Sequence, residues 1–183
     1  MRLAITGTPG TGKTSVCKAL GLEYEYIDLN SVIEEKGFYT GIDTERGSFI
    51  ADLAKIEEYL QQVRKPFLLI ESHLAHLLNP DVVIVLRANP LLLSKRLMQR
   101  GFSARKRDEN VDAETLDIIL TEAVELCAVV YEVDTSDKRV AEVAAVVREI
   151  IDTEIEECES SSRKDALRRR YKPGCVDWTL LRK

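Results

Sequence analysis

The sequence of 183 residues predicts a three-layer α/β fold, in which a parallel five-stranded sheet carries helices on both faces. Two observations lead to this prediction. Short apolar runs typical of buried strands recur along the chain, and segments with the apolar spacing of amphipathic helices lie between them. Strands that alternate with helices pair in parallel, and ligands bind at the carboxyl ends of such strands.

Each expected element is marked by its own residues. The strands are expected at Leu3–Ile5, Tyr24–Ile27, Phe67–Ile70, Val82–Leu86 and Val129–Val133. Helices are expected where apolar residues recur with helical spacing after a residue suited to a helix start, because Asp and Asn are favoured N-caps and proline suits the first turn. These start residues are Asp52, Asn89-Pro90, Asp112 and Ser136-Asp137, and a further helix is expected to begin near Lys13.

The first strand leads directly into Gly-Thr-Pro-Gly-Thr-Gly-Lys-Thr at residues 7–14. The form G-x-x-x-x-G-K-T between a strand and a helix is typical of the P-loop that binds the phosphates of a nucleoside triphosphate. Gly10 and Gly12 let backbone N–H groups approach phosphate oxygens. The Lys13 ammonium is expected near the β- and γ-phosphates, and the Thr14 hydroxyl on Mg²⁺. The alternative is a glycine-rich turn that binds nothing.

The composition of the chain excludes several classes of protein. The chain is 45% apolar and 31% charged, as in soluble proteins, and its apolar runs fall well short of the roughly 18 residues of a membrane span. Since no signal peptide precedes the first strand, we expect a cytoplasmic protein without a membrane partner. Cys17, Cys127, Cys158 and Cys175 lack zinc spacing, and Cys17 and Cys127 are expected to be buried free thiols.

Two polar stretches do not fit the framework, residues 30–50 and residues 100–110. Segments of this kind beside a nucleotide site commonly serve as lids. Phosphoryl transfer needs cations around the transferring group and exclusion of water. The second stretch, a link between two helices, is therefore a candidate lid, and the alternative is a solvated turn. Its basic residues are Arg100, which is the first candidate, Arg105, Lys106 and Arg107.

Glu71 and His73 directly follow the expected strand Phe67–Ile70. A carboxylate at the carboxyl end of a parallel strand is suited to hold a Mg²⁺-bound water. His73 is a candidate to orient a water or a phosphate, and the alternative is a structural histidine. His76, within an apolar run, is expected to be structural.

The P-loop, Glu71-x-His73 and Arg100-Gly101-Phe102 together resemble the atypical adenylate kinase family, which includes the eukaryotic nuclear adenylate kinase, ribosome-assembly ATPases and archaeal relatives. The resemblance is to an archaeal-type member and covers residues 1–157. It implies a nucleoside monophosphate (NMP) kinase fold with an NMP-binding insert near residues 30–50 and a short lid near residues 99–109. The ATP contacts that it implies are Gly10, Gly12, Lys13, Thr14, Ser15, Arg100 and Lys138.

The same resemblance implies a reaction, a metal and partners. The reaction is ATP + AMP ⇌ 2 ADP, with an ATPase activity and a role in maturation of the small ribosomal subunit. The family's usual Asp-x-His motif handles Mg²⁺ and serves hydrolysis, and Glu71 stands here for the Asp. Lys13, Glu71, His73 and Arg100 are thus the catalytic candidates, with Thr14 and Glu71 on the metal. The implied partner is a small-subunit ribosomal protein of the S11/S14 type.

Three alternatives to this function stay open. The first is a ribosome-assembly ATPase whose kinase activity is secondary, and the second is a protein that holds ATP as a structural ligand. The third is another small-molecule P-loop kinase, for example one acting on shikimate. The acceptor contacts are equally open. Arg46 is a candidate for the AMP phosphate and Thr40-Gly41 for a close backbone approach, or else the insert is simply solvated.

Residues 158–183 form a basic tail outside the resemblance. From Arg163 to the end the net charge is +6, which leaves −11 on the remainder of the chain. A short basic helix is expected from Asp165 to Tyr171, stopped by Pro173-Gly174, and Trp178 is expected to pack back on the body. Arg168–Arg170 are candidates for contact with ribosomal RNA, and the alternative is a clasp onto the acidic body.

Overall fold

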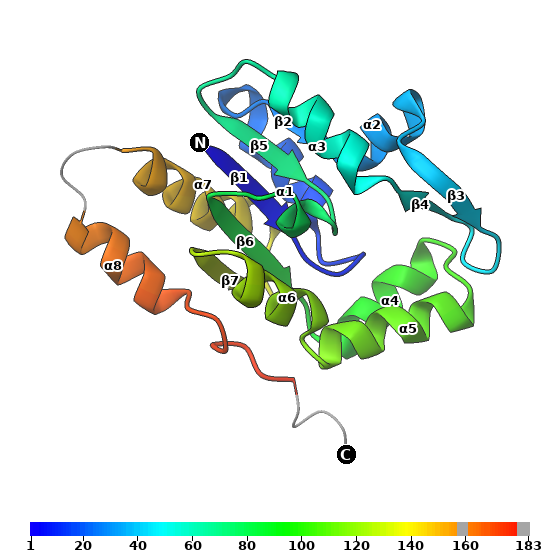
Figure 1. The fold of residues 1–183 in the computed structure, drawn as a ribbon. Coiled ribbons are helices and arrows are strands. Elements are labelled where there is room, and N and C mark those ends of the chain that lie inside the picture. Colours follow the sequence, from blue (N-terminus) through cyan, green and yellow to red (C-terminus); the bar gives the residue numbers. More distant parts are fainter. Residues whose placement is uncertain (157–160, 179–183) are drawn as a thin grey trace.

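A computed structural model describes residues 1–156 and 161–178 of the chain. The main sheet consists of β1 (Arg2–Thr6), β2 (Tyr26–Asp28), β5 (Leu68–Glu71), β6 (Val82–Arg87) and β7 (Val130–Asp134). The strands are parallel and lie in the order β2-β5-β1-β6-β7 (Figure 1). The predicted five-stranded parallel sheet is therefore confirmed, with β2 beginning two residues later than expected.

Helices cover both faces of the sheet, because alternate residues of each strand point to opposite sides. Leu3 and Ile5 of β1 pack in one core with α1 (Lys13–Leu20), α7 (Val140–Ile155) and α8 (Ser161–Arg170). Ala4 packs in the other core, which is formed with α2 (Leu29–Lys36), α3 (Leu53–Gln62), the 3-10 turn Ala75–Leu77 and α6 (Ile118–Leu126). The three layers that the sequence predicts are present.

The insert at residues 30–50 has structure of its own. After α2, the strands β3 (Tyr39–Asp43) and β4 (Ser48–Ala51) form a separate antiparallel hairpin. Tyr39 and Phe49 stack across it, with ring centroids 4.4 Å apart. The hairpin lies beside α4 (Pro90–Gln99) and α5 (Ala104–Thr115) in Figure 1.

Two helix starts differ from the sequence prediction. Residues 100–110 were expected to be a link, but most of them belong to α5, which Ser103 caps by accepting from Lys106 N at 3.3 Å. Asp112 lies inside α5 and caps no helix; α6 begins after Asp117, whose φ of 56° marks a left-handed turn. Since Glu114 is the buried residue of α5, this helix has no apolar stripe that could reveal it.

Smaller corrections concern the second half of the chain. The cap of α7 is Arg139 with Glu142, and not Ser136-Asp137. Cys17 is buried as predicted, whereas Cys127 is half-buried at the end of α6. The expected domain boundary at 157–158, Cys158, Arg182 and Lys183 lie outside the described residues. Among those described, no helix is both long and apolar enough to cross a membrane.

The basic tail lies along the sheet edge formed by β7. Its helix α8 begins at Ser161, earlier than Asp165. Arg168 donates two hydrogen bonds of 3.0 Å to the Glu154 carboxylate on α7, and Tyr171 O accepts from Glu132 N of β7 at 2.8 Å. The indole N–H of the half-buried Trp178 donates to Glu114 at 3.4 Å. The tail thus folds back on the body, as the clasp alternative predicts.

Candidate active site

The loop between β1 and α1 wraps an open space at the carboxyl ends of the strands. Gly7 has a φ of 133°, and a Cβ there would lie 2.2 Å from Leu86 O, so a larger residue does not fit. Gly12 has a φ of 102° and is the cap position of α1, where no side chain accepts the helix N–H groups. Free N–H groups and the positive end of the helix dipole together form a site for an anion.

Lys13 is buried beneath this loop. Its ammonium donates to Gly7 O at 2.7 Å and to Thr8 O at 3.1 Å. Burial lowers the pKa of Lys13 to about 8, while the charges of Glu71 and Glu114 oppose that shift. The side chain therefore holds a desolvated positive charge, which a polyphosphate oxygen would stabilise.

Thr14 in the first turn of α1 and Glu71 at the end of β5 come together, because α1 follows β1, which neighbours β5 in the sheet. Glu71 ends β5, and its Oε2 accepts from the Thr14 hydroxyl at 3.0 Å. Burial raises the pKa of Glu71, and the nearby Lys13 works against that rise. A hydroxyl and a carboxylate oxygen are ligands that Mg²⁺ accepts, and they line the same cavity as Lys13. These residues fit the metal predicted from the sequence.

The two histidines of this region have different surroundings. His73 lines the cavity, and burial, with Lys13 as the next cause, lowers its pKa to about 4. It is therefore neutral at pH 7. His76 is buried, with Nδ1 3.2 Å from the Thr6 hydroxyl oxygen and Nε2 3.0 Å from Glu122. The structural role predicted for His76 is confirmed.

Two adjoining cavities follow the loop. One, of about 130 Å³, is lined by Lys13, Thr14, Asn30, Glu71, His73 and Arg100, among others. The other, of about 300 Å³, is lined by Ser15, Arg96, Thr135 and Lys138, among others. They share Gly10, Gly12 and Arg100. The structure thus brings together the residues that the sequence predicts around ATP.

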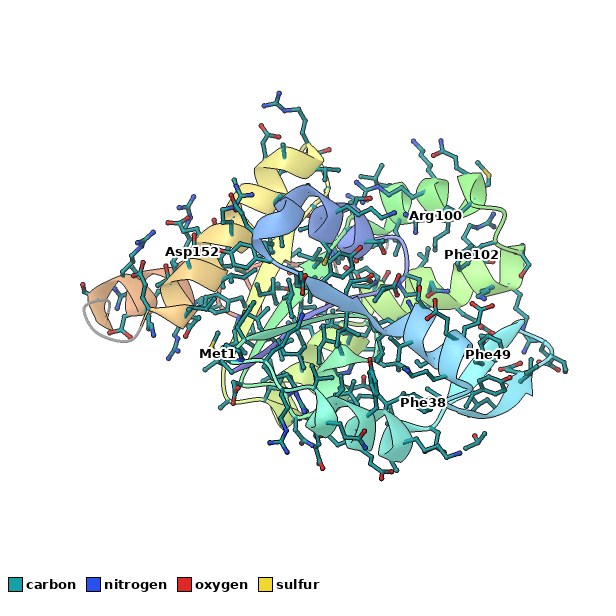
Figure 2. All side chains as sticks on the ribbon, turned by 90° about the horizontal axis from the view of Figure 1, so that it is seen from above. Met1, Phe38, Phe49, Arg100, Phe102 and Asp152 are labelled. Carbon is teal, nitrogen blue, oxygen red and sulfur yellow. The ribbon has the colours of Figure 1, made fainter. Side chains whose placement is uncertain are left out.

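Arg100 lies at the junction of the two cavities. It is the C-cap of α4, where its N–H donates to Arg96 O and Leu97 O, and its side chain is exposed. Figure 2 shows Arg100 and Phe102 near each other, on α4 and on the turn that follows it. The guanidinium is near enough to Lys13 to contribute to the lowered pKa of that residue.

Other candidates point elsewhere. Arg46 donates to Glu109 of α5 at 2.8 Å and to Asp43 at 2.9 Å. Arg105 pairs with Glu45 at 2.9 Å, and Lys106 Nζ donates to Arg46 O at 2.8 Å. These residues, with Thr40 and Gly41, are not among those lining the two cavities in the described part of the chain. They join the hairpin tip to α5.

Two residues that line the cavities were not predicted from the sequence. Arg96 donates weakly to Gly10 O at 3.4 Å and to Thr135 O at 3.4 Å, beside the larger cavity. Its position four residues before Arg100, on the same helix face, is a signal that could have revealed it. Asn30 lines the smaller cavity and accepts from the Ser72 hydroxyl at 3.3 Å. No pattern in the sequence marks it.

Known proteins resemble this chain over most of its length. The family described as "AAA domain" matches residues 3–117. The chain is 41% identical over 188 residues to the "putative adenylate kinase" of Methanosarcina acetivorans, with 97% of each chain covered.

Solved structures show the same fold. Shikimate kinase from Bacteroides thetaiotaomicron matches with a TM-score of 0.56 and 20% identity, covering 83% of this chain and 98% of that one. Thymidylate kinase from Candida albicans matches with a TM-score of 0.54 and 14% identity, covering 84% and 92%. By its identity to the archaeal protein and its match to the domain description, this chain belongs to the adenylate-kinase-like family.

Proposed function

We propose that the chain is a nucleoside monophosphate kinase of the adenylate kinase type, which transfers the γ-phosphoryl group of ATP to AMP and forms two ADP. The observation that carries this proposal is the pair of adjoining cavities that meet at Gly10, Gly12 and Arg100. A nucleoside fits the larger one, beside Lys138, and a polyphosphate fits the smaller one, beside Lys13. The name of the archaeal relative supports the same reaction.

Each residue of the smaller cavity has a role suited to phosphoryl transfer. The Lys13 ammonium stabilises negative charge on the transferring group, and Arg100 adds a second cation from the opposite side of the loop. Thr14 and Glu71 hold Mg²⁺, which when bound neutralises charge on the phosphates. The acceptor phosphate is itself the nucleophile, so the site needs no general base. Asn30 of α2 lines the smaller cavity from the side of the insert, and we expect it to contact the acceptor.

The proposal is tested by ADP formation from ATP with AMP, GMP, CMP and UMP as acceptors, with Mg²⁺ and with chelator. We expect the highest rate with AMP and Mg²⁺, and a loss of about 10²–10³-fold in Lys13→Met, as for removal of a group that stabilises transition-state charge. Lys18→Met, an exposed lysine on the same helix, is the matched control. Should no acceptor raise ADP formation above that with ATP alone, the kinase proposal is wrong.

A second activity, hydrolysis of ATP, is favoured by His73. A neutral imidazole in the phosphate cavity can accept a hydrogen bond from a water and orient it. This activity fits a role in maturation of the small ribosomal subunit with a ribosomal protein partner. We expect His73→Asn to lower ATP hydrolysis without acceptor by at least about tenfold, and to lower transfer to AMP less. Equal losses in both reactions would contradict a role of His73 specific to water.

Contact between the basic tail and ribosomal RNA belongs to the same proposal. All three arginines are exposed, but among the described residues the Glu154 carboxylate accepts from Arg168 and not from Arg169 or Arg170. We expect Arg169→Gln with Arg170→Gln to weaken RNA binding and to reduce its dependence on salt. Unchanged RNA binding in this double variant would leave the clasp as the role of the tail.

A further inference from the structure

A buried group of charged side chains lies behind the P-loop and has no part in the reaction proposed above. Arg87, at the carboxyl end of β6, is 1% exposed. Its Nε donates to Glu114 Oε1 of α5 at 2.7 Å, and its Nη1 donates to Glu132 Oε1 of β7 at 2.5 Å. At the edge of the group, Asp117, whose side chain is 35% exposed, also accepts from the guanidinium. We call these four residues the buried charge cluster.

The buried charge cluster holds three carboxylates and one guanidinium, so its remaining carboxylate oxygens need donors. An ion in the interior without such partners is costly. One donor comes from the P-loop itself, where the Thr8 hydroxyl donates to Glu114 Oε2 at 2.5 Å. A second comes from Ala88 N, which donates to Glu114 Oε1 at 3.0 Å. Glu114 therefore connects the P-loop to the last turn of α5.

The remaining donors come from residues 171–178, which we call the C-terminal segment. The N–H groups of Cys175 and Val176 donate to Glu132 Oε2 at 2.8 and 3.2 Å. The Trp178 indole donates to Glu114 Oε1 at 3.4 Å. Since these donors belong to backbone or to an uncharged ring, they complete the hydrogen bonding of the cluster without adding charge. The C-terminal segment and the P-loop thus share one carboxylate, that of Glu114.

Thr8 transmits this contact to the phosphate site. Its carbonyl oxygen accepts from Lys13 Nζ at 3.1 Å, from Thr11 N at 3.2 Å and from the Thr11 hydroxyl at 2.9 Å. The hydroxyl that binds Glu114 and the carbonyl that binds the ammonium belong to the same residue. A fixed Thr8 therefore fixes both the loop and the position of the Lys13 charge before ATP arrives.

We propose that Glu114 is a positioning residue for the P-loop, and that the C-terminal segment raises the affinity for ATP by holding Glu114 in place. This inference rests on the proposed function, in which the P-loop binds ATP. A loop that is ordered in advance loses less conformational entropy on binding, so its ligand binds more tightly. The C-terminal segment is then a part of the nucleotide site at a distance from it.

The test compares matched variants by calorimetric titration with ATP and Mg²⁺. Thr8→Val keeps the side-chain volume and removes the hydroxyl, so we expect the Kd for ATP to rise about tenfold, since a hydrogen bond to a charged group is lost. Thr8→Ser keeps the hydroxyl and is expected to recover most of the affinity. Thr115→Val is the control, because that hydroxyl donates within α5, to Val111 O at 2.7 Å, and its Kd is expected to stay that of the wild type.

The route through the C-terminal segment is tested by Trp178→Phe, which keeps an aromatic ring and removes the indole N–H. We expect about a threefold higher Kd for ATP, as for a weak hydrogen bond. In the double variant Thr8→Val with Trp178→Phe, the Kd is expected to equal that of Thr8→Val alone, because both changes act on one contact. Effects that multiply, or a Kd in Thr8→Val within twofold of wild type, would overturn the inference.

A second readout separates this inference from the proposed function. Amide hydrogen exchange of residues 7–12 without nucleotide is expected to be faster in Trp178→Phe than in the wild type, because the loop is less firmly held. If the wild type binds no ATP, the proposed function fails, and this measurement still reports on the link between the segment and the loop. Unchanged exchange together with an unchanged Kd would show that no such link exists.

Discussion

Helix α5 makes charged contacts at both of its ends, and these differ in burial rather than in chemistry. At the C-terminal end of the helix, Glu114 Oε1 lies 2.7 Å from Arg87 Nε, and both side chains are 2% exposed. In the N-terminal half of the helix, Glu109 Oε2 lies 2.8 Å from Arg46 Nε, and the side chains of Arg46 and Glu109 are 50% and 34% exposed. Water screens the exposed pair, whereas the buried pair interacts in a medium of low dielectric constant. Nearly equal distances therefore correspond to very different energies.

Because of this difference, one end of α5 is held firmly and the other end is held loosely. The buried end is attached to the sheet and to the P-loop through Arg87 and Thr8. The exposed end touches the hairpin tip through surface contacts, such as that of Arg105 with Glu45. Surface contacts break and reform at little cost, whereas the buried end stays attached. We propose that separation of the hairpin from α5 admits the nucleotide.

The largest effect is expected at the buried end. Arg87→Met keeps much of the side-chain volume and leaves Glu114 and Glu132 without their shared cation. We expect a loss of about 3–5 kcal/mol in the free energy of unfolding, because removing one partner of a buried ion pair leaves uncompensated charge. Urea unfolding followed by circular dichroism measures it. Arg46→Met, at the exposed end, is the control and is expected to leave the urea midpoint unchanged. Equal midpoints in the two variants would refute the comparison.

An intermediate effect is expected for the pair on the tail. The side chains of Arg168 and Glu154 are 42% and 5% exposed, so one partner is buried and the other is not. We expect Arg168→Met to lower the free energy of unfolding by about 1–2 kcal/mol, since the buried Glu154 keeps the Tyr131 hydroxyl as a donor. The same urea experiment applies. A loss as large as that of Arg87→Met would show that burial of both partners is not what sets the energy.

The smallest effect is expected for the pair of Arg46 and Glu109. The hydrogen bond from Arg46 lowers the pKa of Glu109. Because this pKa lies below its ordinary value, the contact persists above the usual glutamate range and is lost as the pH falls through the lowered pKa. Glu109→Gln is expected to change kcat for ADP formation by about twofold at low salt and by less at high salt, because salt screens the pair in the wild type. The urea midpoint is expected to stay unchanged, because the pair is exposed to water. A salt-independent change in kcat would contradict this assignment.

The elements of the main sheet could be predicted because their signals are local. Buried strands such as β6 are apolar from Val82 to Leu86, and the cap residues Asp52 and Asn89 stand where they were expected. The hairpin and α5 could not be predicted in the same way. Ile42 and Ile50 of the hairpin are more than half exposed, and α5 buries little besides Glu114. An element without a buried apolar face has no period for a sequence to reveal.

The candidate site divides in a similar way. Lys13, Thr14 and Glu71 could be expected to meet, since they follow the strands β1 and β5, which neighbour each other in the sheet. Asn30 reaches the cavity from α2, whose position depends on how the insert packs. The ion pairs of Arg46 and Arg105 depend on the approach of the hairpin to α5, which no spacing in the sequence expresses.

The order of residues was enough to establish the parallel sheet, the P-loop and the catalytic candidates around it, because apolar period and a short motif are encoded in neighbouring positions. Tertiary structure alone decided which charged residues are partners. Thr8 and Glu114 are 106 positions apart, and Arg87 meets Glu132 across two strands. An ion pair depends on distance in space and on the exclusion of water, and both arise only once the chain has folded.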